Sequence, residues 1–288
     1  MKQKFLGTFL AISALYLVLL MVPAKGKESI PFYASGDSFN IAHRNGHALM
    51  PANTVEAGLY ALEMGADILE IDLHLSADNY LIVRHDEIID TTTDGVGRIE
   101  DLTLAEIEQY SAKFHEIEYP SKSSPLGIKI PTLSALFEGI PEARFLIEIK
   151  PQNLLASTRL CEVIRQYSMS EQVLVGSFHT SVLRHFRQVC PEVPTSHGRS
   201  EIQRFFVLAK LGLSHLFSPQ GYSIQFPMFH KGWEVFSPQI LKAAHQLNLK
   251  LEIWTINDQE TFDKLIAMGV DGIITDRPDL LSQSLGLQ

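Results

Sequence analysis

Short runs of apolar residues alternate with amphipathic stretches along most of the chain, from Ser38 to the C-terminus. The runs have the length and β-branched character of strands, and the stretches repeat their apolar residues at helical spacing. Strands are expected at residues 40–42, 67–75, 81–83, 145–149, 173–177, 251–254 and 272–275, with a weaker run at 193–196 and an ambiguous one at 216–224. Helices are expected at residues 54–64, 104–110, 237–247 and 259–268.

This alternation of strand and helix predicts parallel strands. A count near eight within about 250 residues fits a closed TIM-like (β/α)8 barrel. An open doubly wound sheet is the alternative, but no glycine-rich dinucleotide fingerprint follows the first strand. Residues 86–144 do not fit one strand–helix unit, because 91–97 is rich in turn residues and 119–131 in serine and proline. We expect a small insertion there, after the second strand and over the mouth of the barrel.

The N-terminus has a different pattern. Lys2 and Lys4 precede an uncharged run from Phe5 to Val22, which is followed by Pro23 and Ala24. This pattern predicts a hydrophobic helix, with residues 1–24 acting as a signal peptide or a membrane anchor. Residues 25–37 are then a linker, and residues 38–288 form the barrel domain. Either alternative places that domain outside the cytoplasm, on the periplasmic or extracellular side.

Composition narrows the possible partners. The formal net charge is -9, which argues against a nucleic-acid partner because such proteins usually present a basic face. The chain has two cysteines, Cys161 and Cys190. Two buried thiols are the favoured interpretation, since free cysteine is usually a core residue. One disulfide is the alternative if the domain is exported.

Carboxylates interrupt two of the apolar strands. Glu70 and Asp72 are two residues apart in a strand and therefore face the same side. Glu148 and Lys150 share one face of another strand in the same way. Neighbouring carboxylates in apolar surroundings repel each other, and a hard divalent cation such as Mg²⁺ or Ca²⁺ compensates them. The alternative is a set of salt bridges to lysine or arginine.

Two histidines follow strand-like runs close to these carboxylates. His43 comes directly after residues 40–42, and His85 follows 81–83. Both are expected at the C-terminal ends of strands, where barrel active sites are built. Two histidines can serve as general acid and general base near neutral pH. Arg44 can hold a phosphate with its guanidinium or form an ion pair with Glu70.

An ordered set of motifs resembles the glycerophosphodiester phosphodiesterase family. The motifs are His43-Arg44, PANT (51–54), GADILEID (65–72), His85-Asp86, IPTL (130–133), EIK (148–150), WTIN (254–257) and GIITDRP (272–278). The resemblance implies a TIM-type barrel with one metal held by Glu70, Asp72 and Glu148. It implies His43 and His85 as the acid/base pair, Arg44 and Lys150 on the phosphate, and Trp254 as an apolar wall of the substrate site.

Three positions depart from the pattern of that family. Asn45 stands where glycine is usual, Ala52 where glutamate is usual, and Thr91 where arginine is usual. The middle of the chain, residues 196–233, carries none of the motifs. Its large apolar residues are expected either in the core or on a lipid-facing rim: Phe205, Phe206, Leu216, Phe217, Phe226 and Phe229.

The expected reaction is hydrolysis of a glycerophosphodiester to glycerol 3-phosphate and an alcohol, with water or a glycerol hydroxyl as nucleophile. One alternative is a lysophospholipase D or sphingomyelinase D-like activity on membrane lipids. Another is a non-catalytic barrel that binds phosphodiesters. The expected partners are a small-molecule phosphodiester or lysolipid, with a membrane contact through the N-terminal segment.

Overall fold

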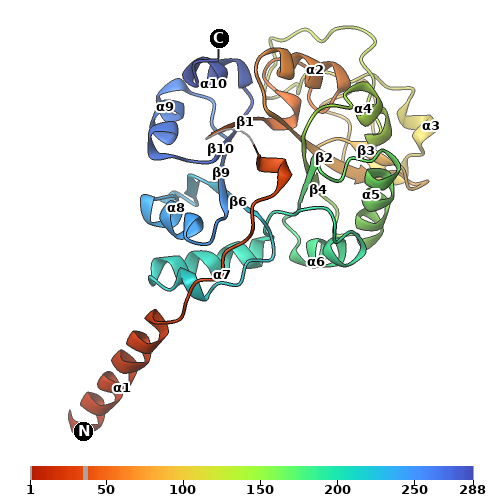
Figure 1. The fold of residues 1–288 in the computed structure, drawn as a ribbon. Coiled ribbons are helices and arrows are strands. Elements are labelled where there is room, and N and C mark those ends of the chain that lie inside the picture. The colour runs from red at the N-terminus through yellow and green to blue at the C-terminus, as the bar shows by residue number, and fades with distance from the viewer. Residues whose placement is uncertain (1, 35–37, 288) are drawn as a thin grey trace.

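The structure is a computed structural model that describes residues 2–34 and 38–287. A ring of helices surrounds a curled parallel sheet, and the N-terminal helix α1 (Lys2–Leu20) projects away from it (Figure 1). In the described part of the chain, no helix combines the length and the apolar character needed to cross a membrane.

The parallel strands form a barrel. They are β1 (Phe39–Ala42), β2 (Ile68–Leu75), β4 (Phe145–Ile149), β5 (Val173–Gly176), β6 (Ser223–Pro227), β9 (Lys250–Trp254) and β10 (Gly272–Thr275), in the order β5-β4-β2-β1-β10-β9-β6. Two isolated parallel bridges, Val175 with Thr195 and Ser196 with Ser223, place residues 195–196 between β5 and β6. This short segment is the fifth of eight strand positions in chain order, so the predicted (β/α)8 barrel is confirmed.

The run at 81–83 is not a barrel strand, and its prediction as one was wrong. Here β3 (Leu81–Val83) turns back and pairs antiparallel with the end of β2. The physical reason is the tight turn near Asn79, which has a φ of 67° and returns the chain alongside β2. The ambiguous run at 216–224 is a 3₁₀ turn at Ser214–Leu216, followed by a strand that begins only at Ser223.

Helices pack around the barrel between its strands. They are α2 (Val55–Glu63), α4 (Leu133–Gly139), α5 (Leu154–Gln166), α6 (Thr180–Val189), α7 (Arg199–Lys210), α8 (Pro238–His245), α9 (Gln259–Met268) and α10 (Pro278–Ser284). The side chain of Thr54 accepts a hydrogen bond from the Ala57 amide and caps α2. Asp258 caps α9 in the same way, so the side chain of the neighbouring Asn257 is not needed as the cap.

The segment between β3 and α4 has a small core of its own. It contains a 3₁₀ turn (Ile99–Asp101) and a single turn of helix, α3 (Leu104–Ile107), which is shorter than the predicted helix at 104–110. Its buried cluster comprises Ile82, Ile89, Ile99, Ile107, Ala112, Ile128 and Ile130. The fully buried Arg84 donates hydrogen bonds to the Ala52 carbonyl oxygen at 3.1 Å and to Thr92 Oγ1 at 3.0 Å. These bonds tie the segment to the loop before α2.

Part of the predicted linker at 25–37 belongs to the barrel. Phe32 and Tyr33 are buried against Phe39 and Ile68, the first residues of β1 and β2. Burying two aromatic side chains at the N-terminal end of the strands contributes roughly 3–6 kcal/mol of transfer free energy, which explains why this stretch is ordered. The prediction of a linker over the whole range was therefore wrong at these positions.

Tyr33 also reaches a buried carboxyl group. Its hydroxyl donates a hydrogen bond to Glu252 Oε1 at 2.5 Å, inside the barrel. Burial raises the pKa of Glu252 to about 7, although the hydrogen bond from Tyr33 acts in the opposite direction. The folded protein therefore holds this proton at pH values where the unfolded chain has released it.

We expect Glu252→Gln to stabilise the fold above neutral pH. Between the ordinary glutamate pKa and about 7, the folded state binds more protons than the unfolded state, so Glu252 lowers stability as pH rises. The substitution removes this loss and raises the free energy of unfolding by roughly 1–3 kcal/mol above pH ~8, with little change near pH ~5. Urea unfolding at both pH values measures the difference, and an equal effect at both contradicts the assignment.

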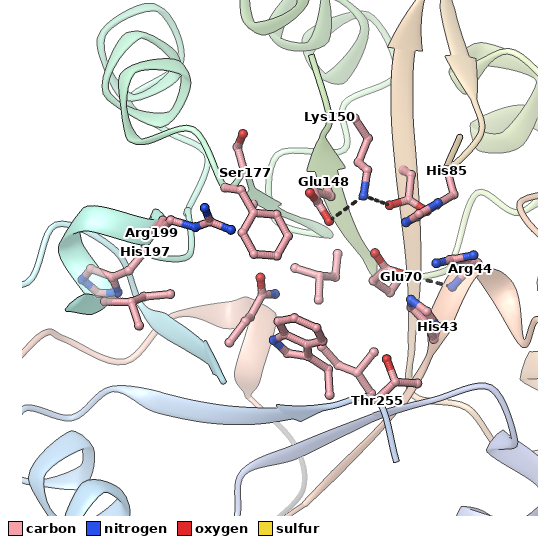
Figure 2. Close-up of a pocket in the computed structure, with 18 residues that line it drawn as sticks. His43, Arg44, Glu70, His85, Glu148, Lys150, Ser177, His197, Arg199 and Thr255 are labelled. Atoms are coloured by element: carbon pink, nitrogen blue, oxygen red, sulfur yellow. Dashed lines mark hydrogen bonds and ion pairs between the residues drawn. The ribbon is translucent and has the colours of Figure 1, made fainter. Parts of the chain in front are cut away.

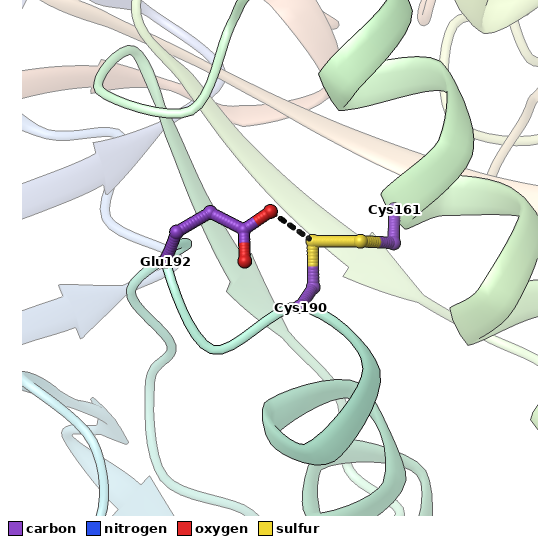
Figure 3. A group of neighbouring side chains, drawn as sticks. All are labelled: Cys161, Cys190 and Glu192. Carbon is purple, nitrogen blue, oxygen red and sulfur yellow. Dashed lines mark hydrogen bonds between the residues drawn. A yellow bond between two sulfur atoms is a disulfide. The ribbon is translucent and has the colours of Figure 1, made fainter.

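The two cysteines are bonded to each other, which corrects the favoured prediction of free thiols. Cys161 on α5 and Cys190, directly after α6, form a buried disulfide with a Cα–Cα distance of 5.6 Å (Figure 3). The two helices pack side by side and bring the side chains within bridging distance. Glu192 Oε1 lies 3.6 Å from Cys190 Sγ and 2.6 Å from Arg165 Nε. Because both sulfurs are oxidised, this group offers no thiolate ligands for a metal.

We expect the Cys161→Ser/Cys190→Ser variant to lose stability. The disulfide closes a chain segment with a sequence separation of 29. Its removal should cost roughly 3–4 kcal/mol, mainly because the unfolded chain gains freedom. Guanidinium unfolding of the variant measures the loss. The oxidised wild type should show the same loss on addition of reductant, and a reductant with no effect contradicts the pairing.

Candidate active site

The eight residues that the sequence singled out line one pocket, at the C-terminal ends of the barrel strands (Figure 2). They are His43, Arg44, Glu70, Asp72, His85, Glu148, Lys150 and Trp254. His85 reaches this pocket by a route that the sequence did not predict. Because β3 runs back along β2, the Arg84 amide donates to the Asp72 carbonyl oxygen at 2.9 Å, and His85 follows at the level of the acidic cluster.

The acidic cluster consists of Glu70, Asp72 and Glu148. In the register of β2 and β4, Asp72 lies directly beside Glu148. One oxygen from each of the three carboxylates lies within 4.8 Å of the others, close enough to share one ion. Glu70 and Asp72 are buried, and Glu148 is half-buried.

The electrostatics of the cluster fit a cation site. Burial, and then the charge of Asp72, raise the pKa of Glu70 well above its ordinary value. Burial also raises the pKa of Glu148 to about 7. Burial also acts to raise the pKa of Asp72, but Lys150 and other cationic groups together have the larger effect and hold this pKa below its ordinary range. The protein alone thus stabilises the anionic form of two of the three carboxylates poorly. A hard divalent cation supplies the positive charge that stabilises this form.

Neighbouring groups fix the cluster in place. Lys150 Nζ lies 3.4 Å from both Asp72 Oδ1 and Glu148 Oε2. These two salt bridges agree in part with the alternative interpretation, in which lysine or arginine compensates the carboxylates. This one ammonium contacts two of the three carboxylates, however, and does not balance the charge of the cluster. The Arg44 amide donates to Glu70 Oε2 at 2.8 Å, and Asn53 Nδ2 donates to Asp72 Oδ2 at 3.0 Å.

Each of the two histidines is held by a carboxylate. His43 Nδ1 donates to Asp276 Oδ1 at 2.6 Å, and His85 Nδ1 donates to Asp86 Oδ1 at 2.7 Å. The hydrogen bond from His85 lowers the pKa of Asp86, although burial opposes it. Burial acts to raise the pKa of Asp276, but the hydrogen bond and the charge of His43 bring it below its ordinary value. Asn257 Nδ2 donates to the second oxygen of Asp276 at 2.7 Å. With Nδ1 engaged, Nε2 of each ring is the nitrogen left for proton transfer in the pocket.

Sequence reasoning missed four of these supporting residues. Asp86, Asp276, Asn257 and Asn53 all lie inside motifs that carry the family resemblance, but neither residue type nor spacing predicted a role for them in this site. Asp276 and Asn257 follow β10 and β9, respectively, which are separated from His43 by more than 200 positions in the chain. Only closure of the barrel, through the pairing of β1 with β10, brings them together.

The loop after β1 explains one departure from the family pattern. Arg44, Asn45 and Gly46 have φ values of 49°, 63° and 85°, all in the left-handed region. Glycine is the usual residue there, and asparagine is among the few others that adopt the conformation at low cost. The buried Asn45 also donates from Nδ2 to the Thr54 carbonyl oxygen at 3.0 Å. Asn45 therefore preserves the shape of the loop.

The same loop presents the Arg44 side chain to the pocket. Its Nε is buried and has no hydrogen-bond partner among the described residues. Arg44 donates to Glu70 from its backbone amide, and its guanidinium forms no ion pair with Glu70, which was the alternative interpretation of this residue. An unpaired buried donor beside an acidic cluster suits a ligand that brings its own negative charge.

The far side of the pocket is more apolar. The rings of Phe178 and Trp254 meet edge-to-face at a centroid distance of 6.0 Å. The guanidinium of Arg199 lies 5.5 Å from the Phe178 ring centroid. The nearby His197 is structural, because the Gly221 amide donates to its Nε2 at 3.1 Å and burial lowers its pKa to about 4.

Comparison with known proteins finds relatives over most of the chain. The sequence model of the glycerophosphoryl diester phosphodiesterase family matches residues 43–280. A glycerophosphodiester phosphodiesterase from Caldanaerobacter subterraneus subsp. tengcongensis is 32% identical over 251 residues, covering 84% of this chain and 95% of the relative. Lysophospholipase D GDPD1 of Rattus norvegicus is 22% identical over 270 residues, covering 86% of each.

A solved structure shows the same fold. It is an Oleispira antarctica phosphodiesterase in complex with the product sn-glycerol-3-phosphate, with a TM-score of 0.70 and 25% identity, covering 85% of this chain and 96% of that one. Fold and sequence together define the class of the protein as a phosphoric diester hydrolase. The chain belongs to the glycerophosphoryl diester phosphodiesterase family, as its ordered motifs predicted.

Proposed function

We propose that the protein hydrolyses glycerophosphodiesters to glycerol 3-phosphate and an alcohol, with a divalent cation and a histidine pair. The observation that carries the proposal is the convergence of three kinds of group in one pocket. These are a triad of carboxylates, two histidines each held by a carboxylate, and two cationic side chains. The product-bound relative, a phosphodiesterase, supports glycerol 3-phosphate as the shared product.

Glu70, Asp72 and Glu148 would hold the cation, and oxygen ligands suit either Mg²⁺ or Ca²⁺. When bound, such a cation neutralises charge on the phosphodiester and polarises its phosphoryl oxygen. Arg44 and Lys150 line the same pocket and stabilise the remaining negative charge as it develops.

The histidines move the protons. One accepts a proton from the nucleophile at Nε2, while the other donates a proton from Nε2 to the oxygen of the leaving alcohol. Asp276 and Asp86 fix the ring orientations and stabilise each imidazolium as it forms. The bond from phosphorus to the leaving oxygen breaks as the bond to the nucleophile forms. A glycerol hydroxyl as nucleophile gives a cyclic phosphate that a water then opens, and water as nucleophile gives glycerol 3-phosphate directly.

Lysolipids are a second candidate substrate class. The apolar far side of the pocket, formed by Phe178, Ile202 and Trp254, favours a substrate with an apolar portion. The name of the rat relative, lysophospholipase D, supports this alternative. A non-catalytic barrel is disfavoured, because the acidic cluster and both histidine–carboxylate pairs are present together.

Release of choline measured side by side from glycerophosphocholine and lysophosphatidylcholine tests the proposal. We expect release from glycerophosphocholine that stops on addition of chelator. Release from the lysolipid alone makes the lysophospholipase D alternative correct. Binding without any release makes the protein a phosphodiester-binding barrel and overturns both activities.

We further propose that the barrel domain acts outside the cytoplasm. The uncharged run from Phe5 to Val22 supports export, and so does the Cys161–Cys190 disulfide, because disulfides persist mainly in oxidising compartments. Fractionation of native cells tests the proposal, and a wholly cytosolic protein contradicts it. Mass spectrometry of the mature N-terminus then shows whether cleavage follows Ala24.

A further inference from the structure

A short hairpin extends from the end of β6. Its strands are β7 (Phe229–His230) and β8 (Trp233–Glu234), in which Phe229 pairs with Glu234 and His230 with Trp233. Lys231 and Gly232 form the turn, with φ values of 51° and 81°. Such a two-residue turn with both residues left-handed matches the natural twist of a hairpin. We refer to residues 228–235 as the rim hairpin.

The rim hairpin stands at the edge of the active-site pocket. Pro227, the last residue of β6, pairs with Trp254, which lines the pocket. Gln225, two residues earlier on β6, lines it as well. The Val235 amide donates to the Met228 carbonyl oxygen at 2.9 Å and fastens the base of the hairpin beside this edge.

Both aromatic residues of the rim hairpin are exposed. Trp233 is 78% exposed and Phe229 is 59% exposed. By contrast, Phe205, Phe217 and Phe226 are buried, so these three members of the set predicted as core or rim are core residues. The hydrophobic effect opposes exposure of two large rings at one tip, which marks the tip as a contact site.

The arrangement of the rings indicates what they contact. Residues paired across a hairpin point to the same face, and successive residues point to opposite faces. Trp233 and His230 therefore occupy one face. Phe229 occupies the other face together with the exposed Glu234. A groove on a folded protein covers one face of a hairpin, whereas the interfacial layer of a bilayer surrounds both. Aromatic rings settle in that layer, and a lysine such as Lys231 can extend its ammonium to lipid phosphates.

We propose that the rim hairpin is a membrane-contact element that inserts Phe229 and Trp233 into the interface of a phospholipid bilayer. This inference goes beyond the proposed hydrolysis and does not depend on it. Insertion turns the pocket mouth toward the lipid surface, since the base of the hairpin lies beside Trp254. An amphiphilic phosphodiester can then pass from the bilayer to the pocket without fully entering water.

The fluorescence of Trp233 can itself report membrane contact. The chain has two tryptophans, so Trp254→Phe in the full-length protein leaves Trp233 as the single indole. Its fluorescence is measured with phosphatidylcholine vesicles that contain phosphatidylglycerol and lipids brominated on their acyl chains. We expect a blue shift and quenching by the brominated lipids. Emission that vesicles leave unchanged overturns the proposal, whether or not the protein has phosphodiesterase activity.

A kinetic comparison separates membrane contact from shaping of the pocket. Phe229→Ser/Trp233→Ser is compared with Leu59→Ser/Tyr60→Ser, which removes two exposed apolar side chains from α2 on the outside of the barrel. All proteins keep α1, so its contribution is common to them. We expect the hairpin variant to lose about tenfold or more of its rate on lysolipid in vesicles. Its rate on soluble glycerophosphocholine stays unchanged, and the α2 variant behaves as wild type on both.

Other outcomes overturn the proposal. An equal loss on both substrates means that the hairpin shapes the pocket. An unchanged rate on a lysolipid that the wild type hydrolyses in vesicles means that the hairpin does not contact lipid. If the wild type is a dimer in size-exclusion chromatography and the hairpin variant is a monomer, the occupant is a second copy of the chain. Absence of turnover on every substrate counts against the proposed function alone, because the fluorescence of Trp233 still decides the membrane contact.

Discussion

His43→Ala and His85→Ala should each lower turnover of a glycerophosphodiester by roughly 10²–10⁴-fold, the usual effect of losing a general acid or base. The reason is geometric, since Asp276 and Asp86 engage Nδ1 of the two rings and leave Nε2 for the reaction. Substrate binding should change much less, because Arg44 and Lys150 remain.

The double variant extends this test. The two losses should not add, since residues that act as a unit rarely have additive effects. His185→Ala is the matched control, because His185 on α6 does not line the pocket and bonds Thr158 instead. Turnover and substrate affinity are measured separately for each folded variant. Near-normal turnover in both single variants shows that the proposed mechanism is wrong, even though the family is correct.

Removing the cation should have the second large effect. We expect a chelator to lower turnover by about 10³-fold or more, since a bound cation supplies several kcal/mol of charge stabilisation. Mg²⁺ or Ca²⁺ should restore it. The three clustered carboxylates, two of them with raised pKa values, carry this expectation.

A substitution in the acidic cluster tests whether the cluster is the site at which the cation acts. Glu148→Gln should require a higher cation concentration for half-maximal activity, because it removes one charged ligand. Glu192→Gln is the control, since Glu192 lies beside the disulfide and outside the pocket. Titration of each apo protein with Mn²⁺, followed by electron paramagnetic resonance, measures cation binding independently of enzyme activity. Full activity in metal-free buffer, or equal affinity of the two variants, contradicts the role of the cluster.

Local patterns sufficed to predict that the side chains of the acidic cluster lie together, although they did not predict Asp86 or Asp276. The two-residue period of a strand places Glu70 and Asp72 on one face, and the structure shows them there. It also predicted that a second strand would bring Glu148 and Lys150 to the same pocket. These predictions succeed because the geometry of a strand is set by the strand itself.

The features that were missed depend on contacts between distant parts of the chain. The run Leu81–Val83 has the composition of any strand, and only its antiparallel pairing with β2 distinguishes it from a barrel strand. Asp276 reaches His43 only because β10 closes the ring onto β1. Phe32 is buried only because the N-terminal ends of the strands leave apolar surface for it to cover. No local pattern records these contacts.

Phosphorus-31 NMR of the purified protein with glycerophosphocholine tests the central claim most directly. With Mg²⁺ or Ca²⁺ present, we predict that the diester signal is replaced by that of glycerol 3-phosphate, and that chelator or His43→Ala prevents the change. A diester signal that persists with either cation in the wild type contradicts the claim.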